Sequence, residues 1–149
     1  MKTLFEKAEY EEIVRRINSL DPSSRRQWGK MSVSQMLAHC SVGIETSLGE
    51  KATKRNFLGY IFGPIAKKQI FSDKPFKHDL PTDKAFKMTG DKEFESEKTK
   101  LLALAKRFNE ASPASFENII HPFFGKMTKD ELGALQWKHI DHHLQQFGK

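Results

Sequence analysis

The chain has 149 residues, of which 38% are hydrophobic and 30% are charged, a composition typical of one soluble globular domain. No apolar run approaches the roughly 20 residues needed to cross a bilayer, and the charged N-terminal residues are unlike a signal peptide. We therefore expect a single domain over residues 1–149, located in the cytoplasm, in which the one cysteine, Cys40, remains a free thiol.

The net charge of +6 is unevenly distributed along the chain. Residues 51–90 contain nine basic and three acidic side chains, which accounts for the whole excess. A basic segment raises nucleic acid as a partner, but no zinc-finger, RNP-like or helix-turn-helix signature accompanies it. We interpret it as a solvated surface that could also attract an anionic thiol, and expect neither a nucleic-acid nor a membrane partner.

Apolar residues at helical spacing predict four main helices, at residues 4–19, 32–48, 91–110 and 128–148. Two of them begin at capping boxes, in which a hydroxyl side chain accepts an early backbone N–H and a residue three positions later reaches back. These boxes are Ser32 with Gln35 and Thr128 with Glu131.

The long connection over residues 50–90 is predicted to contain a short helix over 56–70, interrupted at Gly63–Pro64. Its aromatic residues are interpreted as anchors that hold the connection to the rest of the domain: Phe57, Tyr60, Phe62, Phe71 and Phe76. A connection of this length can cross the domain. We therefore predict an all-α, four-helix bundle of up-down-down-up order, with the second and last helices antiparallel.

Two histidines near the C-terminal end share one helix face. His139 and His143 are four residues apart and fall in the middle of the apolar stripe of the last helix, with His142 at its edge. Each buried imidazole needs partners for both ring nitrogens, and a shared divalent metal satisfies one nitrogen of each ring. The spacing therefore favours a metal-binding pair, for which Zn, Ni, Mn and Fe are all candidates.

A third ligand must come from another helix. If the second helix is antiparallel to the last, His39 lies at the same level along the bundle as His139 and His143. Its direction is less clear, because it lies to one side of the main apolar stripe of its helix. It either faces a second neighbouring helix, together with Gln35 and Gly43, or is a surface histidine.

Two stretches resemble a known superfamily. Trp28 followed by the run from Met31 to Cys40 resembles the tryptophan-to-histidine segment of the DinB/YfiT-like proteins, and the run from His139 to His143 resembles their H-x-x-H-H ending. The segments from His121 to Gly125 and from His142 to Gly148 are similar to a subfamily of unknown function within that group.

The resemblance implies a four-helix, up-down-down-up bundle with a divalent metal held by His39, His139 and His143. Characterised members include thiol-dependent transferases and an isomerase that use bacillithiol, mycothiol or glutathione-like thiols. Many members have H-R-G-Q after the last histidine, where this chain has Leu144, Gln145 and Gln146. The substrate contacts of those members are therefore not carried over to this chain.

Three neutral imidazoles leave coordination positions open, and a metal there lowers the pKa of a bound water or thiol. The sequence thus predicts a metal-dependent enzyme that acts on a small molecule, by thiol transfer or hydrolysis. No catalytic residue is assigned, because Glu12 and Glu45 are expected on exposed helix faces and Cys40 is expected to be buried and inert. The alternatives are a non-catalytic bundle that binds metal or forms a homodimer, and a nucleic-acid-binding protein.

Overall fold

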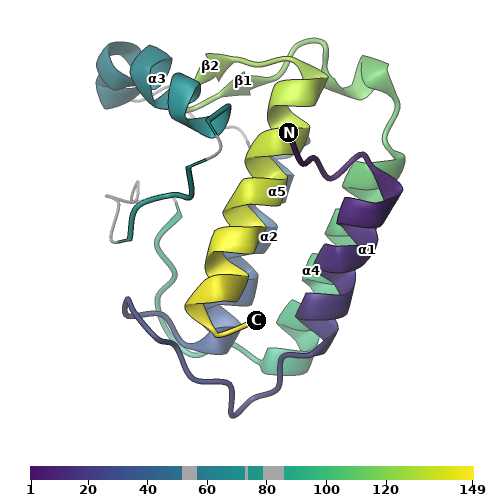
Figure 1. Cartoon of the computed structure of the whole chain (residues 1–149), viewed down its shortest axis with the longest axis vertical. Coiled ribbons are helices and arrows are strands. Elements are labelled where there is room, and N and C mark those ends of the chain that lie inside the picture. The colour runs from purple at the N-terminus through teal and green to yellow at the C-terminus, as the bar shows by residue number, and fades with distance from the viewer. Residues whose placement is uncertain (52–56, 73, 79–85) are drawn as a thin grey trace.

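The computed structural model describes residues 1–51, 57–72, 74–78 and 86–149. The chain is mostly helical, as predicted (Figure 1). Its helices are α1 (Lys7–Asn18), α2 (Val33–Ser47), α3 (Phe57–Ile70), α4 (Phe94–Glu110) and α5 (Lys129–Gln146). Between α4 and α5 lie a short 3₁₀ helix, Pro113–Phe116, and an antiparallel pair of two-residue strands, β1 (Ile120–His121) and β2 (Gly125–Lys126), which the sequence did not indicate.

Both predicted capping boxes are present. The Ser32 hydroxyl accepts the Gln35 backbone N–H at 3.2 Å, and the Gln35 side-chain oxygen accepts the Ser32 N–H at 3.0 Å. Thr128 and Glu131 make the same pair of bonds at the start of α5. These bonds satisfy backbone donors that have no partner within the helix, and so they define where α2 and α5 begin.

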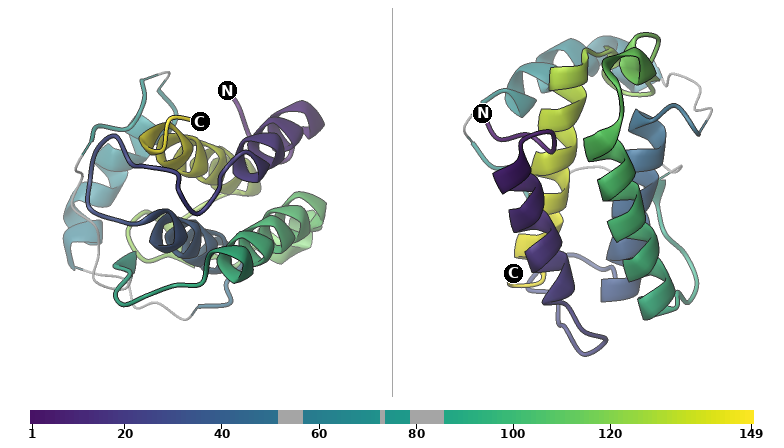
Figure 2. Two further views of the ribbon diagram at one scale, coloured as in Figure 1. Left: turned by 90° about the horizontal axis from the view of Figure 1, so that it is seen from below. Right: turned by 90° about the vertical axis from the view of Figure 1, so that its right-hand side faces the viewer.

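The four long helices form a ring in which α2 contacts α4 and α5, and α1 also contacts both α4 and α5 (Figure 2). In Figure 1, α2 and α4 run upward and α1 and α5 run downward, so α2 and α5 are antiparallel. The side chains enclosed by the ring are apolar, and the largest fully buried ones include Ile13, Leu37, Leu101, Phe108 and Ile140. Ala8, whose helical spacing with Ile13 and Ile17 would place it inward, is exposed.

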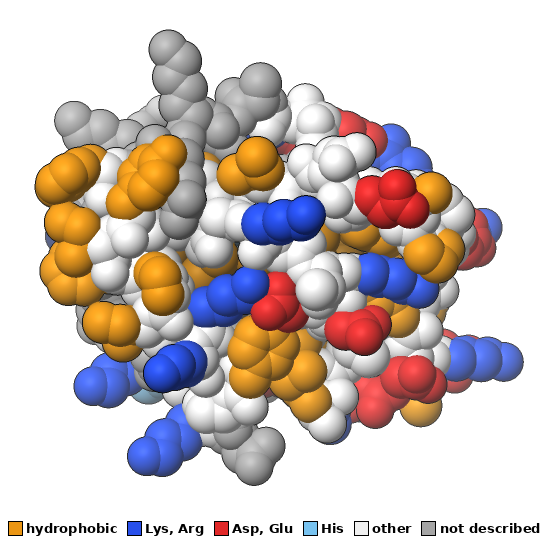
Figure 3. Space-filling view, turned by 90° about the horizontal axis from the view of Figure 1, so that it is seen from above, with side chains coloured by type: hydrophobic (Ala, Val, Ile, Leu, Met, Phe, Trp, Pro, Cys, Tyr) orange, Lys and Arg blue, Asp and Glu red, His pale blue; other side chains and the backbone are white. Residues whose placement is uncertain are grey.

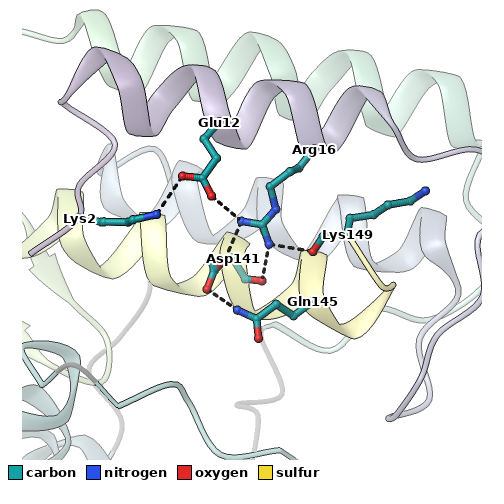
Figure 4. Close-up of polar contacts among 6 residues, drawn as sticks. All are labelled: Lys2, Glu12, Arg16, Asp141, Gln145 and Lys149. Atoms are coloured by element: carbon teal, nitrogen blue, oxygen red, sulfur yellow. Dashed lines mark hydrogen bonds and ion pairs between the residues drawn. The ribbon is translucent and has the colours of Figure 1, made fainter.

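A buried arginine joins α1 to α5. Arg16 donates to the Asp141 carboxylate at 2.6 Å and to the main-chain oxygen of Lys149 at 2.9 Å (Figure 4). Glu12 approaches the same guanidinium, and Gln145 donates to the second Asp141 oxygen. The face of α5 opposite the histidines is therefore held against α1 by charge-assisted bonds.

The helix α3 lies across one end of the ring, beside β1 and β2 (Figure 1). It continues through Pro64, where we expected an interruption. Gly63 has no Cβ to clash with the proline ring, which relieves the usual restriction on the residue before proline. The first residue of the predicted helix, Asn56, lies outside the described residues.

The aromatic anchors are only partly confirmed. Phe76 is half-buried and packs against the core. Phe57, Tyr60 and Phe62 are 75%, 59% and 51% exposed, and Phe71 is also exposed, so these four do not anchor the connection. Their prediction was wrong because, among the α3 side chains that the structure describes, the buried positions are Gly59 and Gly63 and the large apolar residues point outward.

Among the described helices, none has both the length and the apolar character needed to pass through a bilayer.

Candidate metal centre

The structure brings His39, His139 and His143 together. One ring nitrogen from each residue lies within 4.8 Å of the others. His39 is buried and faces α5, which answers the question that its angular position left open. A metal bound by three imidazoles at about 2.1 Å in tetrahedral geometry holds their nitrogens about 3.4 Å apart, so the widest separation in the cluster must close by up to about 1.4 Å. The three histidines could therefore hold a metal ion.

The three rings are arranged edge to face around one point. Their centroids are 4.8 Å apart for His39 and His139, 4.7 Å for His39 and His143, and 4.9 Å for His139 and His143. The Nε2 atoms of His39 and His139 are 2.9 Å apart. Two imidazole nitrogens at this distance need either a proton or a cation between them.

The outer nitrogens of two rings have hydrogen-bond acceptors. The His39 Nδ1 lies 2.8 Å from the main-chain oxygen of Phe86, which can only accept, so Nδ1 carries the proton. The His143 Nδ1 lies 3.0 Å from Gln146 Oε1, while the Gln146 amide nitrogen donates to the Trp28 main-chain oxygen at 2.8 Å. In neutral imidazoles both Nε2 atoms then present a lone pair toward the centre of the cluster.

The outer side of His139 adjoins Gly43 and Gln136. The Gln136 amide nitrogen donates to the Gly43 main-chain oxygen at 3.2 Å and to the Ser47 hydroxyl at 2.7 Å, which leaves its buried Oε1 without a hydrogen-bond partner. A Cβ placed on Gly43 would lie 3.0 Å from His139 Nδ1 and 3.2 Å from Gln136 Oε1. The unpartnered Gln136 Oε1 and the His139 Nδ1 therefore both lie close to Gly43.

Burial keeps the cluster neutral. Desolvation, and after it the neighbouring His39, lower the pKa of His143 from 6.5 to about 3. Desolvation likewise lowers the pKa of His39 and, with His39 and His143 as additional causes, that of His139. Neutral imidazole is the form that binds metal, so no deprotonation is required at neutral pH.

Aromatic groups flank the cluster on two sides. His142, expected at the rim, is half-buried, with its ring centroid 5.1 Å from that of His143 and 5.8 Å from that of Trp28. Trp28 in turn stacks on His78 at 3.9 Å. On the other side, Phe86 contacts His39 through its carbonyl oxygen and through its ring.

His121 was not assigned a role from the sequence. It is buried, its Nδ1 accepts the backbone N–H groups of Phe123 and Phe124 at 3.2 Å each, and burial lowers its pKa to about 4. It is close enough to contribute to the lowered pKa of His139. The two backbone bonds assign the proton to its Nε2.

The other candidate groups lie elsewhere. Glu45 pairs with Lys100 at 2.7 Å and with Lys51 at 3.4 Å, and the more exposed Glu12 pairs with Lys2. Cys40 is buried beside Met36, and desolvation raises its thiol pKa, which is consistent with an inert side chain. In the described part of the chain, the histidine cluster includes no carboxylate and no thiol.

These features define a mostly helical protein with a buried three-histidine cluster between two antiparallel helices. A family model described as a protein of unknown function, DUF1569, matches residues 4–149, and the chain belongs to that family. Comparison with curated proteins and with solved structures gives no match. The family description names no activity, so the function must be argued from the site.

Proposed function

We propose that this protein is a divalent-metal-dependent enzyme that acts on a small molecule, with His39, His139 and His143 as the metal ligands. The observation that carries the proposal is that the Nε2 atoms of His39 and His139 lie 2.9 Å apart. The proton of neutral His39 is on its Nδ1, which faces the carbonyl oxygen of Phe86, so its Nε2 has only a lone pair. Two lone pairs cannot face each other at this distance without a cation or proton between them.

The hydrogen bonds behind the rings favour a metal over a shared proton. Ligand histidines in metal sites commonly donate their outer N–H to a carbonyl or carboxylate. Here the acceptors are Phe86 O for His39 and Gln146 Oε1 for His143, and the unpartnered Gln136 Oε1 lies beside Gly43, as does His139 Nδ1. A proton shared by His39 and His139 would instead leave the buried Gln136 oxygen unsatisfied, at a cost of about 1–3 kcal/mol.

A metal held by three imidazoles supplies a Lewis acid that converts a bound water or thiol to its anion near neutral pH. The chain contributes the neutral ligands and an aromatic surround, of which Trp28 and Phe86 are part. Thiol transfer is the favoured reaction through the resemblance to the DinB/YfiT-like proteins, and hydrolysis is the alternative. Zn, Ni, Mn and Fe are the candidate metals.

The resemblance also suggests the order of the helices, and the free cysteine suggests the compartment. We propose that the four long helices are a DinB-type bundle of up-down-down-up order, which the opposed directions of α2 and α5 support. A reducing cytoplasm suits the free, buried Cys40 and a low-molecular-weight thiol as cosubstrate.

Metal content tests the proposal. The protein is stripped with chelator, reloaded with each candidate metal, desalted and measured by elemental analysis, beside the variant His139→Ala/His143→Ala. We expect near-stoichiometric metal in the native chain and in a His78→Ala control, whose side chain is exposed, and little in the double variant. Equal and negligible metal in all three would refute the site.

An activity assay distinguishes a metal-dependent enzyme from a bundle that only binds metal. The loaded protein is assayed with low-molecular-weight thiols paired with electrophilic acceptors, and with small esters. Activity that follows metal content supports the enzyme, whereas stoichiometric metal with no turnover across the set would identify a non-catalytic metal-binding bundle.

A further inference from the structure

The helix α3 exposes a broad apolar face. Its side chains Phe57, Ile65, Tyr60, Phe62 and Ile61 are between 50% and 75% exposed. In Figure 3 the hydrophobic side chains of this region gather at one side of the upper end of the molecule. Contiguous apolar groups of this size on a soluble chain mark a surface that contacts something else.

The orientation of α3 is fixed by its inner side. Gly59 and Gly63 are buried, and a Cβ on Gly63 would collide with the main-chain oxygen of Phe123. Lys67, near the end of α3, donates to the main-chain oxygen of Lys126 at 2.9 Å and pairs with Glu131 at 2.7 Å. The helix therefore cannot rotate to bury its large residues, because only glycine fits at the inner contact.

The positive charge of the chain lies in the same segment. Residues 51–90 hold nine basic and three acidic side chains. In the part of that segment that the structure describes, Lys68, Lys74 and Lys77 are exposed, and no ion pair of theirs is present among the described residues. Lys54, Arg55 and Lys84 lie outside the described residues.

The described part of α3 carries exposed apolar and aromatic side chains together with Lys68, and Lys74 and Lys77 follow it closely in the chain. This combination matches an anionic lipid surface. The apolar side chains enter the boundary between headgroups and acyl chains, and the lysines contact anionic headgroups. A second copy of the chain is disfavoured as the occupant, because symmetric pairing would bring together two segments that each carry a charge of +6. The face is also a convex helix surface and not a groove.

We propose that α3 and its flanking lysines form a peripheral docking surface for membranes that contain anionic lipid. This differs from the expectation, based on the lack of a spanning segment, that the protein has no membrane partner. The surface does not include the three histidines, so its behaviour is independent of the metal. Docking would hold the domain at the bilayer by one end.

Vesicle flotation tests the proposal with the full chain. Vesicles of phosphatidylcholine alone are compared with equimolar phosphatidylcholine and phosphatidylglycerol. We expect binding to the anionic vesicles only, weakened by salt. Each lysine near an anionic surface contributes about 1 kcal/mol, or about fivefold, so Lys68→Glu/Lys74→Glu should weaken partitioning at least about 25-fold. Ile61→Asp/Ile65→Asp should weaken it at least about tenfold.

A matched control removes the same charge from the opposite end. Arg25 and Lys30 are exposed in the loop between α1 and α2, at the end of the molecule away from α3 (Figure 1). Arg25→Glu/Lys30→Glu should bind within about twofold of the native chain if the surface is local. Circular dichroism establishes that all variants are folded, which is expected because the substituted side chains are exposed.

Four results would overturn the proposal. The first three are no binding to anionic vesicles, equal binding to neutral vesicles, and equal losses in the control and the lysine variant. A fourth is a stable dimer in light scattering that Ile61→Asp/Ile65→Asp dissociates, which would assign the face to a second copy. The variant His139→Ala/His143→Ala should float like the native chain, and so a failed metal site leaves this test intact.

Discussion

Gly43 on α2 lies directly against the imidazole of His139 on α5, so closely that a methyl group at Gly43 would force the ring or the helix to shift by a few tenths of an ångström. A Cβ at this position would be 3.0 Å from Nδ1 and 3.1 Å from Cε1 of the ring. The two helices can approach at the cluster because this residue has no side chain. A glycine inside a helix costs about 1 kcal/mol relative to alanine. The close approach of the two helices therefore comes with a loss of intrinsic helix stability in α2.

The first prediction concerns that contact. Gly43→Ala should displace His139 and weaken metal binding at least about tenfold, although alanine is the better helix former. It should also destabilise the metal-free protein by about 1–3 kcal/mol through overpacking. Calorimetric metal titration and urea unfolding measure the two effects. In a His139→Ala background the same substitution should be neutral or stabilising, and an unchanged penalty there would contradict the proposed clash.

The second prediction concerns the outer hydrogen bond of His143. Gln146→Leu removes the acceptor of the His143 Nδ1–H and the donor to Trp28 O. We expect metal affinity to fall about 10- to 100-fold, because the ring loses both its orientation and its fixed tautomer. Competition with a chromophoric chelator measures this. Gln145→Leu is the matched control, since Gln145 is the exposed neighbour, and equal affinities for the two variants would show that the bond is unimportant.

The third prediction is a pH dependence. The pKa of His143 is lowered in the folded state from 6.5 to about 3, so the unfolded chain binds more protons between these values. Its contribution to stability is therefore present above about pH 6.5 and is lost as pH falls toward about 3. Between about pH 7.5 and pH 5, the metal-free protein should lose about 2 kcal/mol more in unfolding free energy than His143→Asn does. Urea unfolding in chelator at both pH values checks this, and parallel losses would contradict it.

The fourth prediction concerns the bonds between α1 and α5. Arg16→Ala leaves the partly buried Asp141 carboxylate without its 2.6 Å partner and should cost about 3 kcal/mol of unfolding free energy. The neighbouring Arg15 is exposed, so Arg15→Ala should change stability by less than about 0.5 kcal/mol. Arg16→Met/Asp141→Leu should recover part of the loss, because it removes both charges together. Equal effects of the two arginine substitutions would rule out a structural role for this ion pair.

The periodicity of the last helix predicted that His139 and His143 share an inward face, since a fixed angle per residue determines it. The periodicity of α2 could not predict which way His39 points, because α2 contacts both α4 and α5 and so buries more than one face. Here the resemblance, and not the spacing, selected His39. In the structure His39 is buried against α5, beside His139.

The groups behind the ligands could not be predicted. Gln136 and Gln146 are polar side chains that a helical pattern assigns to solvent or to the stripe edge, yet both are buried. The acceptor for His39 is a main-chain oxygen of Phe86, to which no sequence pattern points. Arg16 was missed for a similar reason, because a charged residue in an amphipathic helix is expected to be exposed.

The exposed aromatic residues of α3 were placed wrongly because hydrophobic side chains were assumed to face inward. The glycines at positions 59 and 63 held the contrary signal, since small residues on one side of a helix allow close backbone contact there. The large apolar side chains that the structure describes on α3 are then left outside.

His39 and His139 are separated by 100 positions in the sequence and meet only where α2 packs on α5. His39 belongs to α2, whereas its two partners both belong to α5. No fragment that lacks α5 can assemble the three-histidine cluster. If the proposed metal binds, it would therefore be retained only by molecules in which α2 and α5 are already packed together.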